Sequence, residues 1–249
     1  MQSIWEDQSI KPDEIVLVKD GPLTDDLYTA ITQWKKILNK KLTLITLEKN
    51  VGLGKALNIG LKTCQYELIA RMDTDDIALP NRFEKQLEIF QKNNVDVCGS
   101  WVSEFESDEA EIVSYRKVPE HHIDITAYAK KRNPLNHPAV MYKKSKVQEA
   151  GGYKTMIWFE DYYLWVRMIL VGAKFHNIQE ALVNMRAGYG QLERRSGLKY
   201  AMSELIFQRE LLRIGFINTI EFIRNISIRF ISRILPKSLV KLIYKMLRD

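Results

Sequence analysis

The chain has 249 residues, 46% of them hydrophobic and 27% charged, with a formal net charge of +6. This length suits one α/β domain with a sizeable core, and no window of 18 uncharged apolar residues is present, which excludes a membrane-spanning helix. Cys64 and Cys98 have no metal-ligand spacing, and the acidic first 20 residues lack the apolar region of a signal peptide. We therefore expect reduced thiols and a cytoplasmic location.

Three short apolar runs predict the strands of a parallel α/β sheet. They cover residues 15–20, 42–47 and 68–72, and helix-like stretches follow them at 27–38, 55–62 and 82–92. The order strand, helix, strand, helix is the one that parallel α/β sheets require. Because ligands of such sheets bind outside the carboxyl ends of the strands, we expect Asp20, Asn50 and the acids at 73–76 to face one crevice.

A glycine-containing segment, residues 50–60, leads from the second strand into a helix. Its small residues let the loop pass tightly into the helix, whose free N–H groups suit a phosphate or a ribose hydroxyl. The alternative is a loop that needs positive φ and close helix packing for structural reasons. The segment lacks the Gly-Lys-Ser/Thr of a P-loop and the spacing of a dinucleotide fingerprint, which disfavours NTPases and dehydrogenases.

Three carboxylates within four positions follow the third apolar run: Asp73, Asp75 and Asp76. Carboxylates this close repel one another, and a hard cation such as Mg²⁺ or Mn²⁺ that remains open to phosphate oxygens is the usual way to hold them together. An Asp-x-Asp at a strand end therefore indicates a clamp for a nucleotide diphosphate. The alternative is a solvated acidic turn ahead of the helix that begins near Pro80.

Glu160 and Asp161 begin a helix-like, aromatic-rich segment that reaches Val171. Inverting transfer of a sugar needs a carboxylate that takes the proton of the acceptor hydroxyl, and neighbouring aromatic rings suit sugar faces and raise the pKa of such a base by desolvation. The alternative places the two acids at a helix N-terminus for electrostatic reasons, with the aromatic residues as core.

Two further segments carry candidate binding residues. His137 lies between two prolines ahead of a strand, where it is either an acceptor ligand or a structural histidine. Arg186 and Arg194 follow a strand predicted at 181–185, in a glycine-rich loop that could close over a diphosphate or be a solvated basic loop. A further strand is predicted at 112–118.

The basic surplus lies entirely at the C-terminus, where residues 199–249 hold 10 Lys/Arg against 4 Asp/Glu. Helices are predicted at 217–235 and 239–247. In the second region, a basic face is formed by Lys237, Lys241, Lys245 and Arg248. Basic amphipathic helices bind anionic membrane surfaces, although a helix pair that covers the catalytic domain or forms a dimer is an equal alternative. Nucleic-acid binding is disfavoured, because stacking aromatic residues are not interleaved with the basic ones.

Asp20-Gly21, the Asn50/Gly52/Ala56/Asn58/Gly60 string, the Asp-x-Asp motif and Glu160-Asp161 occur in the order seen in family 2 glycosyltransferases with a GT-A fold. The resemblance is to bacterial enzymes of capsule, exopolysaccharide or lipopolysaccharide synthesis and extends from residue 1 to about residue 200. It implies a Rossmann-like, mostly parallel sheet flanked by helices, a nucleotide-sugar donor, a divalent metal and a glycan or lipid-linked glycan acceptor.

The resemblance also implies roles for individual residues. Asp161 is the expected catalytic base, Asp75 and Asp73 are the expected metal ligands with Asp75 nearest the ion, and Asp20 is expected to contact the base or ribose. The other expected residues are Asn50, Gly52, Lys55, Asn58 and Arg71 with Asp73 for the donor, His137, Trp158 and Glu160 for the acceptor, and Arg186 and Arg194 for the diphosphate.

The resemblance begins late, because family members open with a strand and half a helix ahead of the segment that matches residues 1–8. About 25 residues of the pattern are absent, and we expect a misassigned start rather than a shortened protein. We divide the chain into a catalytic domain, 1–200, with a nucleotide-sugar half at 1–100 and an acceptor half at 101–200, and a helical basic appendage at 201–249.

The sequence thus predicts a metal-dependent, inverting glycosyltransferase of cell-surface polysaccharide synthesis that uses a nucleotide diphosphate donor, UDP being the first choice. It acts in the cytoplasm, with peripheral contact to the inner membrane surface through the C-terminal helices. One alternative is a non-catalytic nucleotide-sugar-binding or membrane-docking remnant of the family. Another is nucleotidyl transfer to sugars, which would need a glycine-rich basic loop at the first strand.

Overall fold

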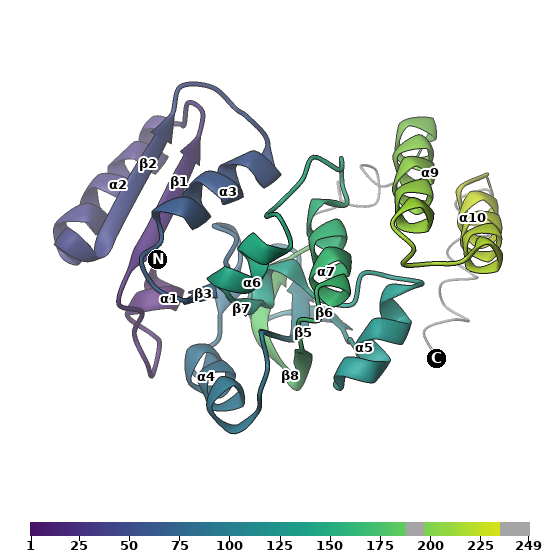
Figure 1. Ribbon diagram of the computed structural model, residues 1–249. Helices are drawn as coiled ribbons and strands as arrows, with labels where there is room; N and C mark the ends of the chain where they lie inside the picture. The colour runs from purple at the N-terminus through teal and green to yellow at the C-terminus, as the bar shows by residue number, and fades with distance from the viewer. Residues whose placement is uncertain (188–196, 235–249) are drawn as a thin grey trace.

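The computed structural model of the protein describes residues 1–187 and 197–234 (Figure 1). Its strands are β1 (Ile15–Asp20), β2 (Leu42–Leu47), β3 (Leu68–Ala70), β4 (Ile77–Ala78), β5 (Val97–Phe105), β6 (Ile112–Arg116), β7 (Met141–Lys143) and β8 (Phe175–Arg186). Its α-helices are α1 (Gln2–Trp5), α2 (Asp25–Leu38), α3 (Leu53–Thr63), α4 (Arg82–Lys92), α5 (His122–Ala129), α6 (Lys144–Glu149), α7 (Glu160–Leu170), α9 (Leu198–Arg213) and α10 (Thr219–Ile234). Two 3₁₀ turns, η1 (Asn39–Lys41) and η2 (His137–Ala139), precede β2 and β7.

The strands form two sheets. β1 and β2 pair in parallel, with Ile15 opposite Leu42 and Asp20 opposite Leu47. The second sheet has the order β3-β7-β5-β8-β4, and β6 pairs with β5 beside this path. β5 and β8 run parallel, whereas the other pairings of this sheet are antiparallel. The predicted α/β architecture with flanking helices is confirmed, but β3 pairs antiparallel with β7 in the second sheet and does not join β1 and β2 in one parallel sheet.

The main core lies where α7 packs on the six-stranded sheet. Leu164, Trp165 and Met168 of α7 are completely buried and share one cluster with Val97 of β5 and Phe175 of β8. β5 is buried almost without interruption, which is the pattern of a strand covered on both faces. Helix α7 therefore has a fixed position, and so do the acidic residues at its first turn.

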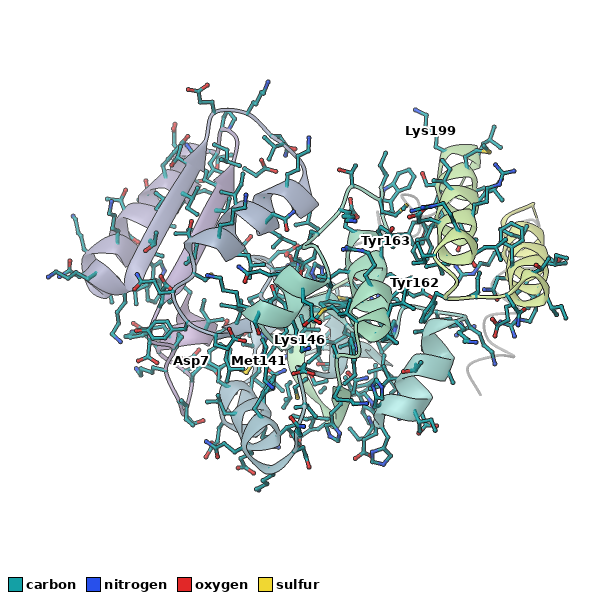
Figure 2. The ribbon with its side chains drawn as sticks, viewed as in Figure 1. Asp7, Met141, Lys146, Tyr162, Tyr163 and Lys199 are labelled. Carbon is teal, nitrogen blue, oxygen red and sulfur yellow. The ribbon has the colours of Figure 1, made fainter. Side chains whose placement is uncertain are left out.

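Helix α9 joins the same body rather than standing apart from it. Phe207 is completely buried and stacks on Phe159 at a ring-centroid distance of 4.8 Å, and the Tyr163 hydroxyl donates to Glu210. Figure 2 shows Tyr162 and Tyr163 on the side of α7 that faces α9. The division predicted at residue 200 falls inside α9, and the division at residue 100 falls inside β5.

Several boundaries differ from those that the sequence predicts. β8 has 12 residues instead of the five predicted, β6 ends at Arg116 instead of Val118, and α10 begins at Thr219 instead of Ile217. The helix predicted at 239–247, its basic face formed by Lys237, Lys241, Lys245 and Arg248, and Arg194 lie outside the described residues. Within the described part of the chain, no helix is long and apolar enough to cross a membrane. Cys64 and Cys98 are free thiols, as predicted.

Candidate active site

Arg71 lies buried just beyond the end of β3 and holds Asp73. Nη1 of Arg71 donates to Oδ2 of Asp73 at 2.6 Å, and Nη2 donates to Oδ1. The main-chain N–H of Arg71 donates to the carbonyl of Val140 at 2.9 Å, while its Nε is buried without a hydrogen-bond partner. Asp73 is thus engaged in a bidentate ion pair, the geometry that a guanidinium and a carboxylate form best.

The next two acids of the motif lie in different environments. Asp75 is exposed, whereas Asp76 is buried and accepts a hydrogen bond of 2.9 Å from the main-chain N–H of Arg186. Burial raises the pKa of Asp76 to about 6, with a further contribution from the charges of Asp73 and Asp75. No choice of one oxygen from each of the three acids brings all three within 4.8 Å of one another.

This donor set fits a hard divalent cation. Two carboxylates together with substrate phosphate oxygens are a usual way in which proteins bind Mg²⁺. Asp75 has an exposed carboxylate, and the charges of Asp73 and Asp75 add to the burial that raises the pKa of Asp76, a repulsion that a cation relieves. The sequence predicts Asp75 and Asp73 as the ligands of this ion, and this assignment stays a prediction.

Arg82 stabilises the start of the Asp-x-Asp loop through hydrogen bonds. The sequence did not indicate this role. It is completely buried in α4, and its Nη2 donates to the carbonyl of Arg71 at 2.6 Å and to that of Val140 at 3.3 Å. Its Nε donates to Gln86 at 3.1 Å. Burial lowers the pKa of Arg82 to about 9. The only sequence signal was Arg82 and Gln86 at i and i+4, which also describes an ordinary exposed helix face.

Asp20 organises the loop between β2 and α3. Its carboxylate accepts hydrogen bonds from the main-chain N–H groups of Val51 at 2.7 Å and Gly52 at 3.2 Å. The side chain of Asn50 also accepts from Gly52, at 3.0 Å. Gly21 has φ +104°, and a Cβ there would lie 3.0 Å from the nitrogen of Asn50, so only glycine fits. Asp20, Asn50 and Gly52 are therefore brought together as predicted, with contacts that fix the loop.

Helix α3 contacts the region around α7 through two pairs of residues. A Cβ on Gly54 would lie 3.4 Å from the side chain of Glu160. The Asn58 amide donates to the carbonyl of Tyr153 at 2.6 Å and accepts from its N–H at 2.8 Å. These hydrogen bonds occupy the side chain of Asn58, for which the sequence predicts a contact with the nucleotide-sugar donor. Lys55, for which the same contact is predicted, is exposed in the first turn of α3.

Asp161 lies in the first turn of α7 and is held by Asn133. Nδ2 of Asn133 donates to Oδ2 of Asp161 at 2.7 Å. Burial raises the pKa of Asp161, and the hydrogen bonds from the Tyr162 N–H and from Asn133 partly offset this shift. Burial and the charge of Asp161 raise the pKa of Glu160. A carboxylate with a raised pKa on a rigid helix suits a general base.

His137 is packed among aromatic residues. Its Nε2 lies 2.9 Å from the Tyr153 hydroxyl, and its ring meets Trp165 edge-on at 5.9 Å. Burial, followed by the charge of Arg71, lowers the pKa of His137 well below its usual range. This shift favours the neutral form of the imidazole, and the contacts of His137 in the protein are internal. The predicted acceptor contact of His137 stays a prediction.

Trp158 borders the two acids and has an uncommon backbone conformation, with φ +68°. Its ring is 42% exposed and lies 5.2 Å from that of Tyr200. A hollow of about 380 Å³ beside it is lined by Ile157, Trp158, Leu198, Lys199, Met202 and Ser203.

The Arg186 guanidinium lies over the ring of Phe105 at 4.7 Å and donates to the carbonyl of Glu106 at 3.3 Å.

Arg71 links the predicted donor and acceptor residues electrostatically. Its positive charge opposes the raised pKa values of Asp76 and Asp161 and adds to the lowered pKa of His137, and in each case burial has the larger effect. The sequence reasoning missed Asn133, Tyr153 and Arg82, which position the predicted residues. Asn133 belongs to the same polar segment as His137, which was the signal available for it.

The chain belongs to the family of glycosyltransferases known as family 2. The sequence-family model described as "Glycosyl transferase family 2" matches residues 3–150 of this chain. Among the curated relatives, "UDP-Gal:alpha-D-GlcNAc-diphosphoundecaprenol beta-1,3-galactosyltransferase" of Escherichia coli is 42% identical, over 98% of this chain and 88% of the relative. "Amylovoran biosynthesis glycosyltransferase AmsE" of Erwinia amylovora is 38% identical, over 96% of this chain and 88% of the relative. The protein is a glycosyltransferase, as the sequence predicts.

Solved structures confirm the GT-A fold. TarS 1-349 of S. aureus in complex with UDP-GlcNAc superposes with a TM-score of 0.61 at 17% identity, over 83% of this chain and 60% of that one. The mannosyltransferase PcManGT of Pyrobaculum calidifontis, in complex with GDP-Man and Mn2+, gives 0.62 at 15% identity, over 84% of this chain and 58% of that one. The chain thus spans about 60% of the length of these two structures.

Proposed function

We propose that this protein transfers a sugar from a UDP-sugar to a glycan carried on a polyprenyl diphosphate, with inversion at C1, in the synthesis of a cell-surface polysaccharide. The observation that carries the proposal is the position of Asp161, a carboxylate with a raised pKa held by Asn133 at the first turn of a buried helix. The names of the relatives from E. coli and Erwinia amylovora support the donor, the lipid-linked acceptor and the polysaccharide product.

Asp161 acts as the general base. The acceptor hydroxyl oxygen forms a bond to C1 of the donor sugar while the bond from C1 to the diphosphate oxygen breaks, and its electron pair leaves with the nucleoside diphosphate. The proton of the hydroxyl passes to Asp161, whose raised pKa makes it a better proton acceptor than an ordinary aspartate. Asn133 keeps the carboxylate in one orientation for this transfer.

The donor binds along the Asp20-organised loop and the Asp-x-Asp loop. Both loops are fixed before the donor arrives, the first by the bonds from Val51 and Gly52 to Asp20 and the second by the Arg71–Asp73 pair and Arg82. Asp75 and Asp73 would hold a divalent ion, which neutralises charge on the diphosphate leaving group when bound. Arg186 lies at the end of β8 beside Asp76 and is the further candidate for the diphosphate.

The lipid-linked acceptor approaches from the side of Trp158. The hollow beside Trp158 has apolar walls and Lys199 at its border, which suits an isoprenoid chain next to a diphosphate. Leu198 and Ile206 on α9 and Ile220 and Ile223 on α10 are exposed, with Leu198 at 77%. Exposed apolar side chains on basic helices suit peripheral contact with an anionic membrane surface.

The test is a transfer assay with purified protein and three donors, UDP-Gal, UDP-Glc and UDP-GlcNAc. Each donor is offered with GlcNAc-diphosphoundecaprenol, with free GlcNAc and with the lipid diphosphate alone, in Mn²⁺ or in EDTA. The proposal expects transfer from one donor to the lipid-linked sugar, in Mn²⁺ only, and a product of inverted anomeric configuration by NMR. Transfer in EDTA would overturn the metal assignment, and retention of configuration would overturn the role of Asp161.

A further inference from the structure

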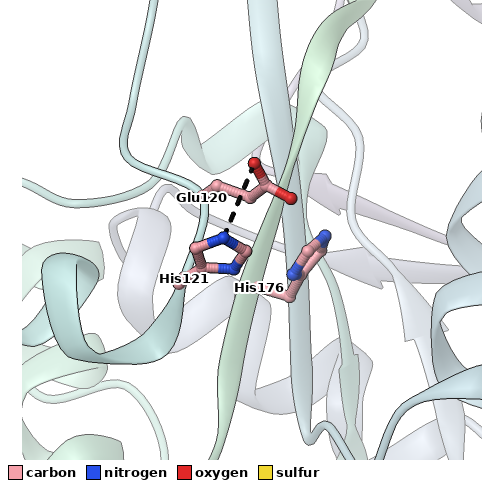
Figure 3. A group of neighbouring side chains, drawn as sticks. All are labelled: Glu120, His121 and His176. Carbon is pink, nitrogen blue, oxygen red and sulfur yellow. Dashed lines mark ion pairs between the residues drawn. The ribbon is translucent and has the colours of Figure 1, made fainter.

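Three metal-ligating side chains meet at a place that the glycosyl transfer does not use. Glu120 and His121 lie just ahead of α5, and His176 is the second residue of β8. One ligand atom from each of the three side chains lies within 4.8 Å of the others, the only such group among the residues that the structure describes (Figure 3). Nε2 of His121 lies 3.9 Å from Oε2 of Glu120.

The backbone that carries these side chains is fixed by hydrogen bonds. The N–H of Asn177 donates to the carbonyl of Glu120 at 2.9 Å, and its side chain donates to the carbonyl of Pro119 at 2.7 Å. His121 and His176 form an isolated antiparallel bridge. Their rings are 6.1 Å apart, with planes at 53°. The three donors are therefore assembled from two chain segments before any ion arrives.

We propose that Glu120, His121 and His176 form a zinc site that ties the start of β8 to the segment before α5. The two imidazoles are borderline-soft donors and the carboxylate is a hard donor. Zn²⁺ accepts both kinds, with water at the fourth position. The half-buried carboxylate of Glu120 supplies a negative charge against the ion. Tetrahedral zinc with bonds of about 2.0 Å needs donor separations of about 3.3 Å. The three donors lie within 4.8 Å of one another, and His121 is exposed, so zinc binding requires the side chains to move closer.

The site lies far along β8 from the Asp-x-Asp loop. His176 lies near the start of β8 and Arg186, whose main chain binds Asp76, ends it. Ten residues of strand correspond to about 30 Å. The ion would act as a structural tie between the start of β8 and the segment before α5.

His122 provides a matched control. It follows His121 directly, but its Nδ1 accepts from the main-chain N–H of Phe175 at 3.3 Å and its ring stacks on that of Phe175. It is therefore directed away from the three donors. Glutamine at this position keeps a hydrogen-bond acceptor and removes an imidazole, so H122Q changes the histidine content without changing the site.

The experiment is calorimetric titration with Zn²⁺ in excess Mg²⁺, which occupies oxygen-only sites, using wild type, H121A, H176A, E120Q and H122Q. The proposal expects one equivalent of Zn²⁺ in wild type and in H122Q, and binding at least 10-fold weaker in H121A and H176A. Zinc at a hundred times Kd should raise the Tm of wild type by about 5 °C or more, and that of H176A by much less.

Circular dichroism and Tm without metal establish that each variant is folded, and D75N serves as a second reference for zinc bound at the Asp-x-Asp motif. Retention of the zinc equivalent in D75N, with its loss in H121A and H176A, supports the site. Equal zinc binding by wild type, H121A and H176A, or no binding by wild type, overturns it. None of these outcomes depends on glycosyl transfer.

Discussion

Asn133 donates a hydrogen bond of 2.7 Å to Oδ2 of Asp161 and so joins the segment before η2 to the first turn of α7. The bond stabilises the charged carboxylate, against the burial that raises its pKa. It acts on Asp161 and does not itself reach the reacting atoms, so Asn133 is a positioning residue. Its removal should alter both the rate and its pH dependence.

We expect N133A to lower kcat by about 10-fold or more, because a hydrogen bond to a charged group contributes about 1.5–3 kcal/mol. Loss of the bond also raises the pKa of Asp161 further, so the acidic limb of the pH–kcat profile should move to higher pH. Steady-state kinetics between pH 5 and 9 measure both effects. K131A, an exposed neighbour, is the control, and an N133A profile identical to that of wild type would contradict this role.

D161N should lower kcat by about 10²–10⁴-fold, the usual contribution of a general base, with unchanged affinity for UDP. It should also raise stability at neutral and higher pH. Because the pKa of Asp161 is raised by folding, its ionisation opposes folding above the folded-state pKa, and this cost disappears below the unfolded-state value. Thermal unfolding at pH 8 and pH 4 tests the difference, and a D161N enzyme with normal turnover would refute the assignment.

D75A should abolish the effect of Mn²⁺ on UDP binding. Asp75 has an exposed carboxylate, whereas Asp73 is bound by Arg71, so the loss of Asp75 removes the carboxylate most accessible to the ion. Lewis-acid stabilisation amounts to several kcal/mol, so we expect Mn²⁺-dependent affinity to fall by about 10²-fold or more. Calorimetry with UDP, with and without Mn²⁺, measures this loss. D108A, on an exposed loop, should bind as wild type does.

Arg82 should be a stability residue with a kinetic effect through the loop above it. R82M removes the hydrogen bonds that Arg82 donates to the carbonyls of Arg71 and Val140 and to the side chain of Gln86, while Val140 keeps the bond from the Arg71 N–H. We expect this loss to cost about 2–4 kcal/mol in the free energy of unfolding. Urea denaturation measures the loss. E88A, an exposed substitution on the same helix, should leave the midpoint unchanged, and an equally stable R82M would contradict the hydrogen bonding described.

F207A tests whether α9 is part of the catalytic domain. Phe207 is completely buried against Phe159, Tyr162 and Tyr163. Truncation to alanine should cost about 3–5 kcal/mol in one cooperative transition. M202A, whose side chain is 49% exposed, is the control. A separate, low-stability transition for α9 would instead favour an independent appendage.

The sequence predicts the strands and helices whose pattern is local. β1 and β2 are found residue by residue, because each is an apolar run bounded by polar turns, and α7 begins at the predicted Glu160. β8 is mostly missed because residues 176–180 read His-Asn-Ile-Gln-Glu, and only the ladder with β5 makes them a strand. Helix α9 is missed because its buried face is defined by the aromatic residues around α7, which lie far away in sequence.

The same distinction holds for the site. Asp161 and the Asp-x-Asp motif are recognisable because acids next to an apolar or aromatic run are unusual. Arg82 and Asn133 are not, because a buried arginine on a helix and an asparagine before proline have ordinary exposed counterparts. Their roles depend on the Arg71 carbonyl and the Asp161 carboxylate, which are distant contacts that only the folded chain supplies.

Gly54 has a consequence for how this chain can vary. Its missing side chain leaves room for Glu160, since a Cβ there would lie 3.4 Å from the Glu160 side chain. The helix after the donor loop and the helix that bears the general base are therefore fitted to each other at this point. Positions 54 and 160 should therefore co-vary among related proteins: a larger residue at one should accompany a smaller residue at the other.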